Sequence, residues 1–378
     1  MRIRYAHIIL TGLLLLSTAG WAQFSPLPAP KEVTELIQET GRAFVPERRL
    51  QVFNVKAEMQ NDTLIVQGET TVAAARDSLL SRLARLRIEP NRIQIVTLPL
   101  ASLGEKTQGV ITVSTAPLRK GPDVDYEMIN QGILGEAVTI LRHAGMFWYI
   151  QLSDGYVGYM MNSSIAVMDK QQFAEWQARP KVIFRENFGQ VYSEKKTNSY
   201  PVCDLTEGLV LARDKKEGKW WRVMLPDGRS GYVLKSQVRP LEEHLAQPKP
   251  TGKQLVHTAR CFTGHPYLWG GLTTKGFDCS GFTKAIYRHY GITLPRDANM
   301  QVLAGEPVAM DSTYSQLQPG DLLFFGRSLQ RITHVGMYIG DKKFIHSDGW
   351  VHINSFNPAD AEFSAYRVKG LQAVRRFL

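Results

Sequence analysis

Residues 267–282 read YLWGGLTTKGFDCSGF and place glycines on both sides of Cys279. The residues that follow have the apolar spacing of a helix, which we expect to begin at Cys279 and to run through Tyr290. A cysteine at the N-terminus of a helix lies near the positive end of the helix dipole, which lowers the pKa of the thiol and favours the thiolate. Because the thiolate is the nucleophile, this position gives Cys279 a chemical role.

Two histidines further along lie in strand-like segments that a short turn joins. His334 lies in residues 331–340 (RITHVGMYIG), and His346 lies in residues 343–347 (KFIHS). A hairpin centred near residue 340 places the two histidines opposite one another, within about one residue of register. Directly opposed residues have Cβ atoms about 4.5–5.5 Å apart, so one imidazole can hydrogen-bond the other. Such a pair supplies a general base and the group that orients it, which a nucleophilic cysteine requires.

Each of these residues also has an ordinary structural explanation. A cysteine at a helix start is more often a small buried hydrophobic residue, and a histidine in a strand more often belongs to the core or the surface. Cysteine and histidine also bind zinc, but a structural zinc site needs four ligands, commonly with closely spaced cysteines. Cys203 is far from the other candidates in sequence. We therefore expect no metal and no cofactor at this site.

Taken together, the motifs of residues 250–378 resemble the NlpC/P60 family of papain-like cysteine peptidases. The matching segments are Tyr267-Leu268-Trp269-Gly270-Gly271, Asp278-Cys279-Ser280-Gly281-Phe282, Pro319-Gly320-Asp321-Leu322, His334-Val335-Gly336-Met337-Tyr338-Ile339-Gly340 and Phe344-Ile345-His346. The resemblance implies that Cys279 is the nucleophile, that His334 is general base and then general acid, and that His346 orients His334. It also implies that Tyr267 lines the active site, where its hydroxyl steadies the oxyanion.

The chain before this domain begins with a predicted export signal. Residues 1–22 contain Arg2 and Arg4, then an apolar run and small residues, which is typical of a secretory signal peptide. Residues 23–106 alternate between helical and strand patterns, and we expect a small αββαβ unit there. No chemistry is apparent in that unit, so its role stays open.

A weak internal repeat follows. Residues 149–159 (YIQLSDGYVGY) and 222–232 (RVMLPDGRSGY) share a strand, an Asp-Gly turn and a Gly-Tyr pair that opens another strand. These copies resemble bacterial SH3 domains, which we place at residues 107–175 and 176–243. The expected fold class is therefore α+β, with the αββαβ unit, two SH3-like β-barrels and a papain-like domain.

The resemblance also implies a substrate class. The family cuts peptidoglycan stem peptides between γ-D-Glu and a diamino acid, and two SH3-like domains before the peptidase resemble the dipeptidyl-peptidase VI type, which requires a free N-terminal L-Ala. In that type an acidic residue after the nucleophile helix holds the substrate's ammonium, and Asp297 matches it, although a turn or capping residue is the ordinary alternative. The following position, often Ser, is Ala298 here. Further candidate substrate-binding residues are Ser280, Asp278, Tyr156 and Glu127.

The amino-acid composition limits the kinds of molecule that the protein is expected to bind. The chain is 44% hydrophobic with a formal net charge of +10, so it has material for real cores and a basic surface. Its Lys and Arg residues are scattered, which favours a solvated surface over a nucleic-acid site. We expect an exported protein, in the periplasm or the medium, with no stable membrane anchor and with peptidoglycan-derived peptides as partners. We expect Cys203 and Cys261 to be buried free thiols rather than a disulfide.

Three alternatives to this function remain. The protein could be an endopeptidase on intact wall with SH3-like targeting domains, a non-catalytic wall-binding protein, or an acyltransferase that uses the same thiol. The sequence leaves open the choice between diaminopimelate and Lys in the substrate, and also the oligomeric state.

Overall fold

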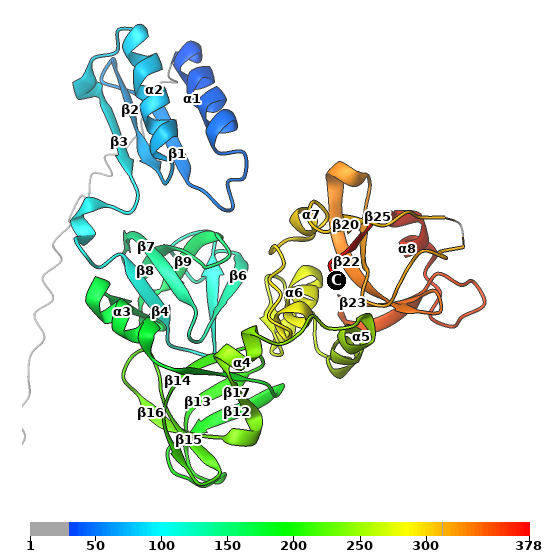
Figure 1. Cartoon of the computed structure of the whole chain (residues 1–378). Helices are drawn as coiled ribbons and strands as arrows, with labels where there is room; N and C mark the ends of the chain where they lie inside the picture. The colour runs from blue at the N-terminus through cyan, green and yellow to red at the C-terminus, as the bar shows by residue number, and fades with distance from the viewer. Residues whose placement is uncertain (1–29, 312) are drawn as a thin grey trace, which may run out of the picture.

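The computed structural model describes residues 30–311 and 313–378, so the predicted signal peptide lies outside the described residues. The chain then forms four units in succession (Figure 1). The first has the elements α1 (Lys31–Phe44), β1 (Phe53–Gln60), β2 (Thr63–Thr70), α2 (Ala73–Arg85) and β3 (Ile93–Thr97). Strand β2 lies in the middle of the sheet, antiparallel to β1 and parallel to β3. This is the expected αββαβ order.

Two all-β units follow, and both have the same topology. The first contains β4 (Gln108–Ile111), β5 (Thr115–Arg119), β6 (Met128–Ile133), β7 (Ala137–Ala144), β8 (Phe147–Gln151), β9 (Val157–Met161) and β10 (Ile165–Met168). The second contains β11 (Lys181–Phe184), β12 (Phe188–Tyr192), β13 (Pro201–Thr206), β14 (Val210–Glu217), β15 (Trp220–Met224), β16 (Ser230–Leu234) and β17 (Val238–Pro240). The orders β10-β4-β7-β8-β9-β5-β6 and β17-β11-β14-β15-β16-β12-β13 are the same when the strands are matched in chain order.

Turn glycines also match between the two copies. Gly155 and Gly228, in the two Asp-Gly turns, both have a φ of +87°, which is the left-handed region that glycine tolerates best. The predicted repeat therefore reflects two structurally equivalent units. Helix α3 (Lys170–Ala178) joins them, so the predicted boundary between residues 175 and 176 falls inside a helix.

The C-terminal unit combines helices with a six-stranded antiparallel sheet of order β20-β25-β21-β22-β23-β24. Its helices are α5 (Gly252–Cys261), α6 (Cys279–Arg288), α7 (Ala298–Gln301) and α8 (Ala365–Gly370). The strands are β18 (Leu272–Thr273), β19 (Gly276–Phe277), β20 (Glu306–Pro307), β21 (Leu322–Gly326), β22 (Ile332–Gly340), β23 (Lys343–Asp348), β24 (Trp350–Ser355) and β25 (Leu371–Arg376). The short helix α4 (Leu241–Leu245) precedes it and contains the buried His244.

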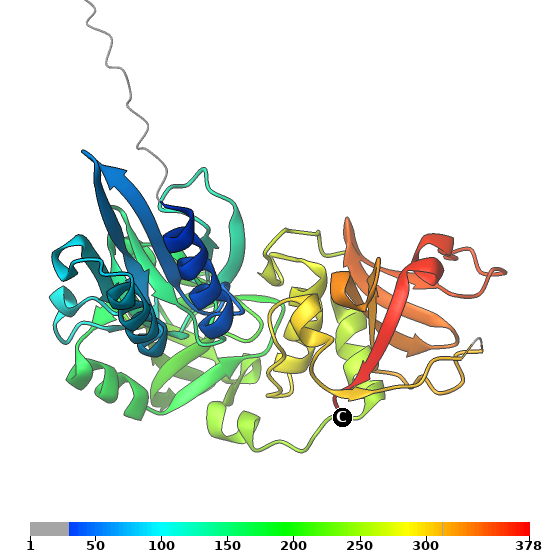
Figure 2. The same cartoon turned by 90° about the horizontal axis from the view of Figure 1, so that it is seen from above.

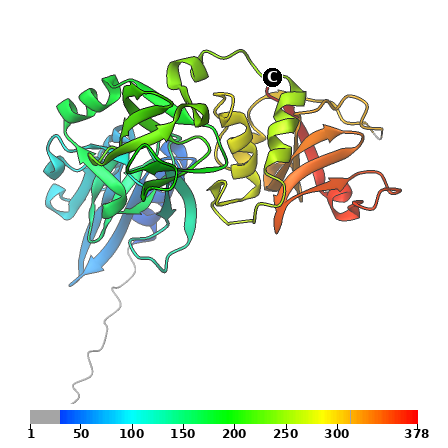
Figure 3. The same cartoon turned by 90° about the horizontal axis from the view of Figure 1, so that it is seen from below.

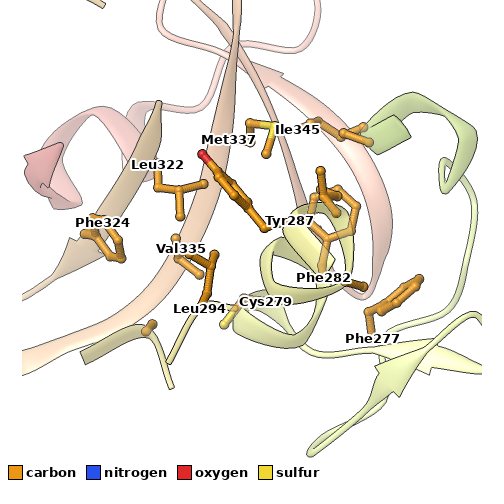
Figure 4. Close-up of a cluster of buried hydrophobic side chains, with 14 of the residues drawn as sticks. Phe277, Cys279, Phe282, Tyr287, Leu294, Leu322, Phe324, Val335, Met337 and Ile345 are labelled. Carbon is orange, nitrogen blue, oxygen red and sulfur yellow. The ribbon is translucent and has the colours of Figure 1, made fainter. Parts of the chain in front are cut away.

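Helix α6 is the centre of this unit. Its residues from Cys279 to Tyr287 are all buried, because one side of the helix packs on the sheet and the rest is covered by α5 and neighbouring loops. Phe282 and Tyr287 pack against Val335 and Ile345 of the sheet (Figure 4). The helix therefore presents its first residue at a rigid position.

The helical face of the C-terminal unit is turned toward the two SH3-like units, and its sheet lies on the outer side (Figures 2 and 3). Buried ion pairs cross the contact. Lys284 of α6 lies 2.9 Å from Asp154 of the first SH3-like unit. Glu207 of the second unit is fully buried against Arg288 and His289. Such pairs fix the relative orientation of the units, because loss of one partner would leave a buried charge.

None of the helices in the described parts of the chain is long and apolar enough to cross a membrane.

Candidate active site

Cys279 is the first residue of α6 and is 8% exposed. The preceding residue, Asp278, caps the helix through a hydrogen bond from Gly281 N–H to Oδ1 (2.7 Å). Gly281 is required here, because a Cβ at this position would lie 2.0 Å from the carbonyl oxygen of Gly271. The thiol lies between α6 and β22, beside Leu294 and Val335 (Figure 4), and it interacts with the backbone N–H of Val335. Since Val335 follows His334 directly, the thiol lies against the backbone next to the predicted base.

The two predicted histidines are in direct contact. His334 Nε2 lies 2.9 Å from His346 Nδ1, and both residues are buried. The strand register differs slightly from the expectation. The pairs Met337–Ile345 and Tyr338–Phe344 place Gly336 opposite His346, so His334 is diagonal to His346 by two residues. The offset arises because the turn is centred on Asp341 and Lys342 rather than on residue 340, and a β-bulge between Tyr338 and Gly340 reduces it by one residue. The absence of a side chain at Gly336 leaves space for His346.

Sequence reasoning did not find Asn354, which completes the chain of hydrogen bonds. Its Oδ1 lies 3.0 Å from His346 Nε2, while its amide nitrogen donates to the carbonyls of Ile353 and Glu362. Because those carbonyls only accept, Asn354 Oδ1 must accept from His346 Nε2–H. His346 Nδ1 then accepts from His334 Nε2–H. This order leaves His334 Nδ1 with a lone pair, as a general base requires.

Both histidines are neutral in this environment. Burial lowers the pKa of His334 well below its usual value, and nearby positive charge from Arg367 acts in the same direction. Burial also lowers the pKa of His346 to about 3. The base is therefore available without prior loss of a proton.

The thiol differs from the sequence-based expectation. Burial raises the pKa of Cys279 to about 12, and the charge of Asp278 adds to the increase. A helix N-terminus contributes up to about 2 kcal/mol, equivalent to about 1.5 pH units, which is smaller than this rise from the ordinary thiol value near 9. The expectation of a free thiolate at Cys279 is thus wrong. The candidate nucleophile is a neutral thiol and the candidate base a neutral imidazole, so the predicted attack requires transfer of the thiol proton.

A buried charge network supports the start of α6. Arg296, which is 2% exposed, donates to both carboxylate oxygens of Asp278, with Nη1–Oδ1 and Nη2–Oδ2 distances of 3.1 and 2.5 Å. Ser280 donates to Asp278 Oδ1 (3.1 Å) and accepts from Arg296 Nη1 (3.0 Å). Arg296 also donates to Asn130 of the first SH3-like unit (2.6 Å). Asp278 and Ser280 therefore hold the nucleophile helix in place, and their contact with substrate stays a prediction.

Two of the candidate substrate-binding residues, Asp297 and Tyr156, are in direct contact. The hydroxyl of Tyr156, from the β8–β9 turn, donates to Asp297 Oδ2 at 3.0 Å. Tyr156 is 4% exposed, and burial beside Asp297 raises the pKa of its hydroxyl, so the phenol is a donor at neutral pH. The same carboxylate oxygen accepts from Arg49 Nη1 at 2.5 Å. Arg49 belongs to the N-terminal unit, and nothing in the sequence motifs pointed to it.

Tyr267 and Glu127 are the remaining predicted site residues. Tyr267 is half-buried, and burial together with the nearby Cys279 raises the pKa of its hydroxyl, which therefore remains a donor. Glu127 is exposed and accepts a hydrogen bond from the indole of Trp269 at 2.9 Å. This contact joins the first SH3-like unit to the loop that carries Tyr267. A role for Glu127 in substrate binding stays a prediction.

All three cysteines are free. Cys203 is buried as expected, whereas Cys261 is exposed, which corrects the expectation that both are buried. Within residues 30–311 and 313–378, no three His, Cys, Asp or Glu side chains are grouped so as to hold a metal ion.

A cysteine at a helix N-terminus, set against a buried histidine pair on an antiparallel sheet, defines a papain-like cysteine hydrolase. The chain belongs to the NlpC/P60 family of cysteine peptidases: residues 264–369 match the NlpC/P60 family, and residues 118–165 match the bacterial dipeptidyl-peptidase Sh3 domain. These matches confirm the predicted fold class.

Curated relatives extend the similarity beyond the catalytic unit. The chain is 33% identical over 230 residues to gamma-D-glutamyl-L-lysine dipeptidyl-peptidase of Bacillus cereus, covering 58% of this chain and 66% of the relative. It is 26% identical over 264 residues to dipeptidyl-peptidase 6 of Lysinibacillus sphaericus, covering 68% of this chain and 94% of the relative. The crystal structure of an NlpC/P60 family protein from Bacillus cereus is also similar, with a TM-score of 0.63 and 26% identity, covering 72% of this chain and all of that chain.

Proposed function

We propose that this protein is a cysteine peptidase that hydrolyses the bond between γ-D-Glu and a diamino acid in peptidoglycan stem peptides with a free N-terminal L-Ala. The names of the curated relatives support the reaction and its substrate class. The observation that carries the preference for a free amine is the pair formed by Asp297 and Tyr156. The carboxylate of Asp297, which accepts a hydrogen bond from the phenol of Tyr156, provides the negative charge that an ammonium group needs as its partner.

The hydrogen-bond order supports a direct mechanism. His334 Nδ1 takes the proton of the Cys279 thiol while the sulfur attacks the γ-carbonyl carbon of D-Glu. The resulting oxyanion accepts hydrogen bonds from the backbone N–H of Cys279 and from the hydroxyl of Tyr267. His346, held by Asn354, stabilises the positive charge that develops on His334.

The second half of the reaction reverses these roles. His334 gives its proton to the α-amine of the diamino acid, which leaves and generates a thioester on Cys279. Water then loses a proton to His334 and attacks the thioester. This step releases L-Ala-γ-D-Glu and restores the thiol, so the cycle needs no cofactor.

We further propose that the protein is exported, because residues 1–22 have the pattern of a secretory signal peptide. Its partners would then be peptides derived from peptidoglycan, with neither nucleic acid nor a stable membrane anchor involved.

The experiment that tests this function is mass spectrometry of products formed from L-Ala-γ-D-Glu-diaminopimelate and from its N-acetylated twin. We expect release of L-Ala-γ-D-Glu from the free peptide alone. Cleavage of both peptides would favour the alternative of an endopeptidase on intact wall. Wall binding without cleavage of either peptide by reduced protein would favour the non-catalytic alternative, and product formed only with an acceptor other than water would favour an acyltransferase.

A further inference from the structure

The loop between α1 and β1 reaches across to the first SH3-like unit, and its backbone is fixed there. The carbonyl of Arg49 accepts from the backbone N–H of Val157 (2.8 Å), and the carbonyl of Leu50 accepts from Gln151 Nε2 (2.7 Å). The side chain of Leu50 packs against the core of that unit. The backbone around Arg49 therefore cannot move independently of the hairpin that carries Tyr156.

A larger contact supports the same docking. A buried cluster joins Val52 and Leu98 of the N-terminal segment to Leu141, Tyr149 and Val157 of the first SH3-like unit. Beside it, Arg142 donates to both carboxylate oxygens of Glu69, at 2.7 and 3.1 Å. An apolar cluster together with a bidentate ion pair indicates that the two units are in permanent contact, rather than that the N-terminal segment moves into and out of the site.

From this fixed position, the guanidinium of Arg49 lies between two carboxylates. Its Nε and Nη2 donate to Glu47 at 2.7 and 2.5 Å, and its Nη1 donates to Asp297 Oδ2 at 2.5 Å. Nη1 also lies 3.1 Å from Asn299 Oδ1. Within the residues that the structure describes, Asp297 Oδ1 has no hydrogen-bond partner. Arg49 and Asp297 remain 33% and 22% exposed, so the carboxylate is still accessible.

The charges of this cluster suit one ammonium group. Glu47 and Asp297 are acidic and Arg49 is basic, which leaves one net negative charge. The hydrogen bond from Arg49 lowers the pKa of Glu47, so the Glu47 carboxylate stays charged at neutral pH. Arg49 thus orients Asp297 without cancelling the negative charge of the cluster.

We propose that the N-terminal αββαβ unit forms part of the substrate pocket, with Arg49 as a positioning and specificity-determining residue. Arg49 holds Oδ2 of Asp297, which leaves Oδ1 for the α-ammonium of the substrate. The Glu47–Arg49 pair closes the space beyond this ammonium, so acylated or N-extended peptides are excluded. This inference rests on the proposed function and assigns a role to residues 23–106.

The test compares Arg49→Ala, Arg49→Lys and Glu47→Gln with the wild type, and uses Arg92→Ala as the control. Arg92 forms an exposed ion pair with Glu89 in the same unit, away from Asp297. Steady-state kinetics are measured with L-Ala-γ-D-Glu-diaminopimelate and its N-acetylated twin. Binding of the dipeptide L-Ala-γ-D-Glu is measured by calorimetry, and circular dichroism checks folding.

For Arg49→Ala we expect the KM for the free peptide and the Kd for the dipeptide to rise about tenfold or more, because Asp297 loses its orientation. The value of kcat changes less, since Arg49 does not touch the reacting atoms. Discrimination against the acetylated peptide falls. Arg49→Lys restores part of the affinity, Glu47→Gln weakens it, and Arg92→Ala changes neither.

Two outcomes overturn the inference. One is an unchanged KM, Kd and discrimination in Arg49→Ala; the other is a lower KM, which would mean that Arg49 competes with the substrate's ammonium. A folded wild type that binds the dipeptide but cuts neither peptide contradicts the proposed function alone. Absence of dipeptide binding by the wild type contradicts the pocket assignment.

A separate observation concerns the other side of the scissile bond. A groove of about 960 Å³ lies along β21, β22 and α8, next to the strand position of His334. Its lining includes the cations Arg327, Arg331, Arg367 and Lys369. Within the described residues, only Arg367 of these four has an acidic partner, which is Asp348.

We infer that this basic groove receives the leaving part of the peptide and binds its carboxylates. Because His334 protonates the leaving amine, the diamino acid must lie on the His334 side of the site. Diaminopimelate carries one carboxylate more than Lys, so a groove with three unpaired cations favours it. This inference also rests on the proposed function, since it presupposes cleavage before the diamino acid.

The test compares kcat/KM for L-Ala-γ-D-Glu-diaminopimelate and L-Ala-γ-D-Glu-Lys, in the wild type and in Arg327→Gln, Arg331→Gln and the control Arg92→Gln. We expect the wild type to prefer diaminopimelate by about tenfold, and the two groove variants to lose much of this preference. Equal rates on both peptides, or a preference that neither groove variant changes, would overturn the inference. If neither peptide is cut, the result contradicts the proposed function. Binding of free diaminopimelate then tests the groove by itself, and equal binding by the wild type and the groove variants would contradict its assigned role.

Discussion

Arg296 donates hydrogen bonds to both carboxylate oxygens of Asp278, at 3.1 and 2.5 Å. Asp278 immediately precedes Cys279, the candidate nucleophile. The pair is buried, and the same carboxylate caps the helix that begins with Cys279. The position of the thiol therefore depends on an ion pair that contacts solvent very little.

This relationship predicts that Arg296→Met is strongly destabilising, because it leaves the carboxylate of Asp278 buried without its partner. We expect a loss of about 3–5 kcal/mol in the free energy of unfolding, measured by urea denaturation. The double variant Arg296→Met with Asp278→Asn should recover part of this loss. Similar stability for single and double variants would show that the pair is not coupled.

Stability should also fall in mild acid, because the unfolded chain takes up protons that the folded chain does not. His346 has a pKa of about 3 when folded, against an ordinary value of about 6.5 when unfolded. Between these values the unfolded state binds more protons, so the free energy of unfolding decreases as the pH falls from 6.5 toward 3. The slope is up to about 1.4 kcal/mol per pH unit for each such histidine.

Urea denaturation at several pH values from 7 to 4 measures this slope. His346→Gln should reduce it, whereas His143→Gln, at an exposed position, should not. An identical slope in His346→Gln and the wild type would mean that His346 is not the group responsible.

The pH dependence of catalysis tests whether His334 is neutral in the active site. Because burial keeps the pKa of His334 well below its usual value, the base stays unprotonated through mildly acidic conditions. We expect kcat/KM for the free peptide to show no decline between pH 8 and pH 6. An acid limb centred near pH 6.5 would indicate that His334 titrates like an exposed histidine.

Asn354 should affect the catalytic rate rather than substrate affinity, because it fixes the tautomer of His346 by a hydrogen bond and does not itself contact the substrate. Asn354→Ala should lower kcat about 10- to 100-fold with little change in KM. Asn357→Ala, on the loop that follows β24, is a control, because the amide of Asn357 donates a hydrogen bond to Asp360 and not to either histidine. Loss of affinity with an unchanged kcat would contradict the role assigned to Asn354.

Replacing the nucleophile separates catalysis from binding. Cys279→Ala should remove measurable turnover, because no other group can form the thioester, while binding of L-Ala-γ-D-Glu persists. Calorimetry and product analysis on the same sample provide the measurement. Cys261→Ala, which removes the exposed thiol, should leave turnover intact; if it abolishes turnover instead, the assignment of the nucleophile is wrong.

Local patterns in the sequence predicted most of the architecture. The αββαβ order, the paired Asp-Gly hairpins, the helix beginning at Cys279 and the strands of the two histidines all arise from short-range periodicity and turn chemistry. Such features are encoded within about a dozen neighbouring residues, so a single sequence reveals them. The resemblance of the motifs then added the roles of Cys279, His334 and His346.

The tertiary structure decided what depends on residues far apart in the chain. Arg49 and Asp297 are separated by 248 positions, and Arg296 and Asn130 by 166, so no local pattern could pair them. Burial reversed the pKa expected for Cys279, because desolvation depends on everything packed around a group and outweighs the helix terminus beside it. The sequence by itself determined the elements that carry the candidate catalytic residues, because short-range periodicity and turn chemistry encode them. Long-range packing decided the protonation of these residues and brought the N-terminal unit into contact with Asp297.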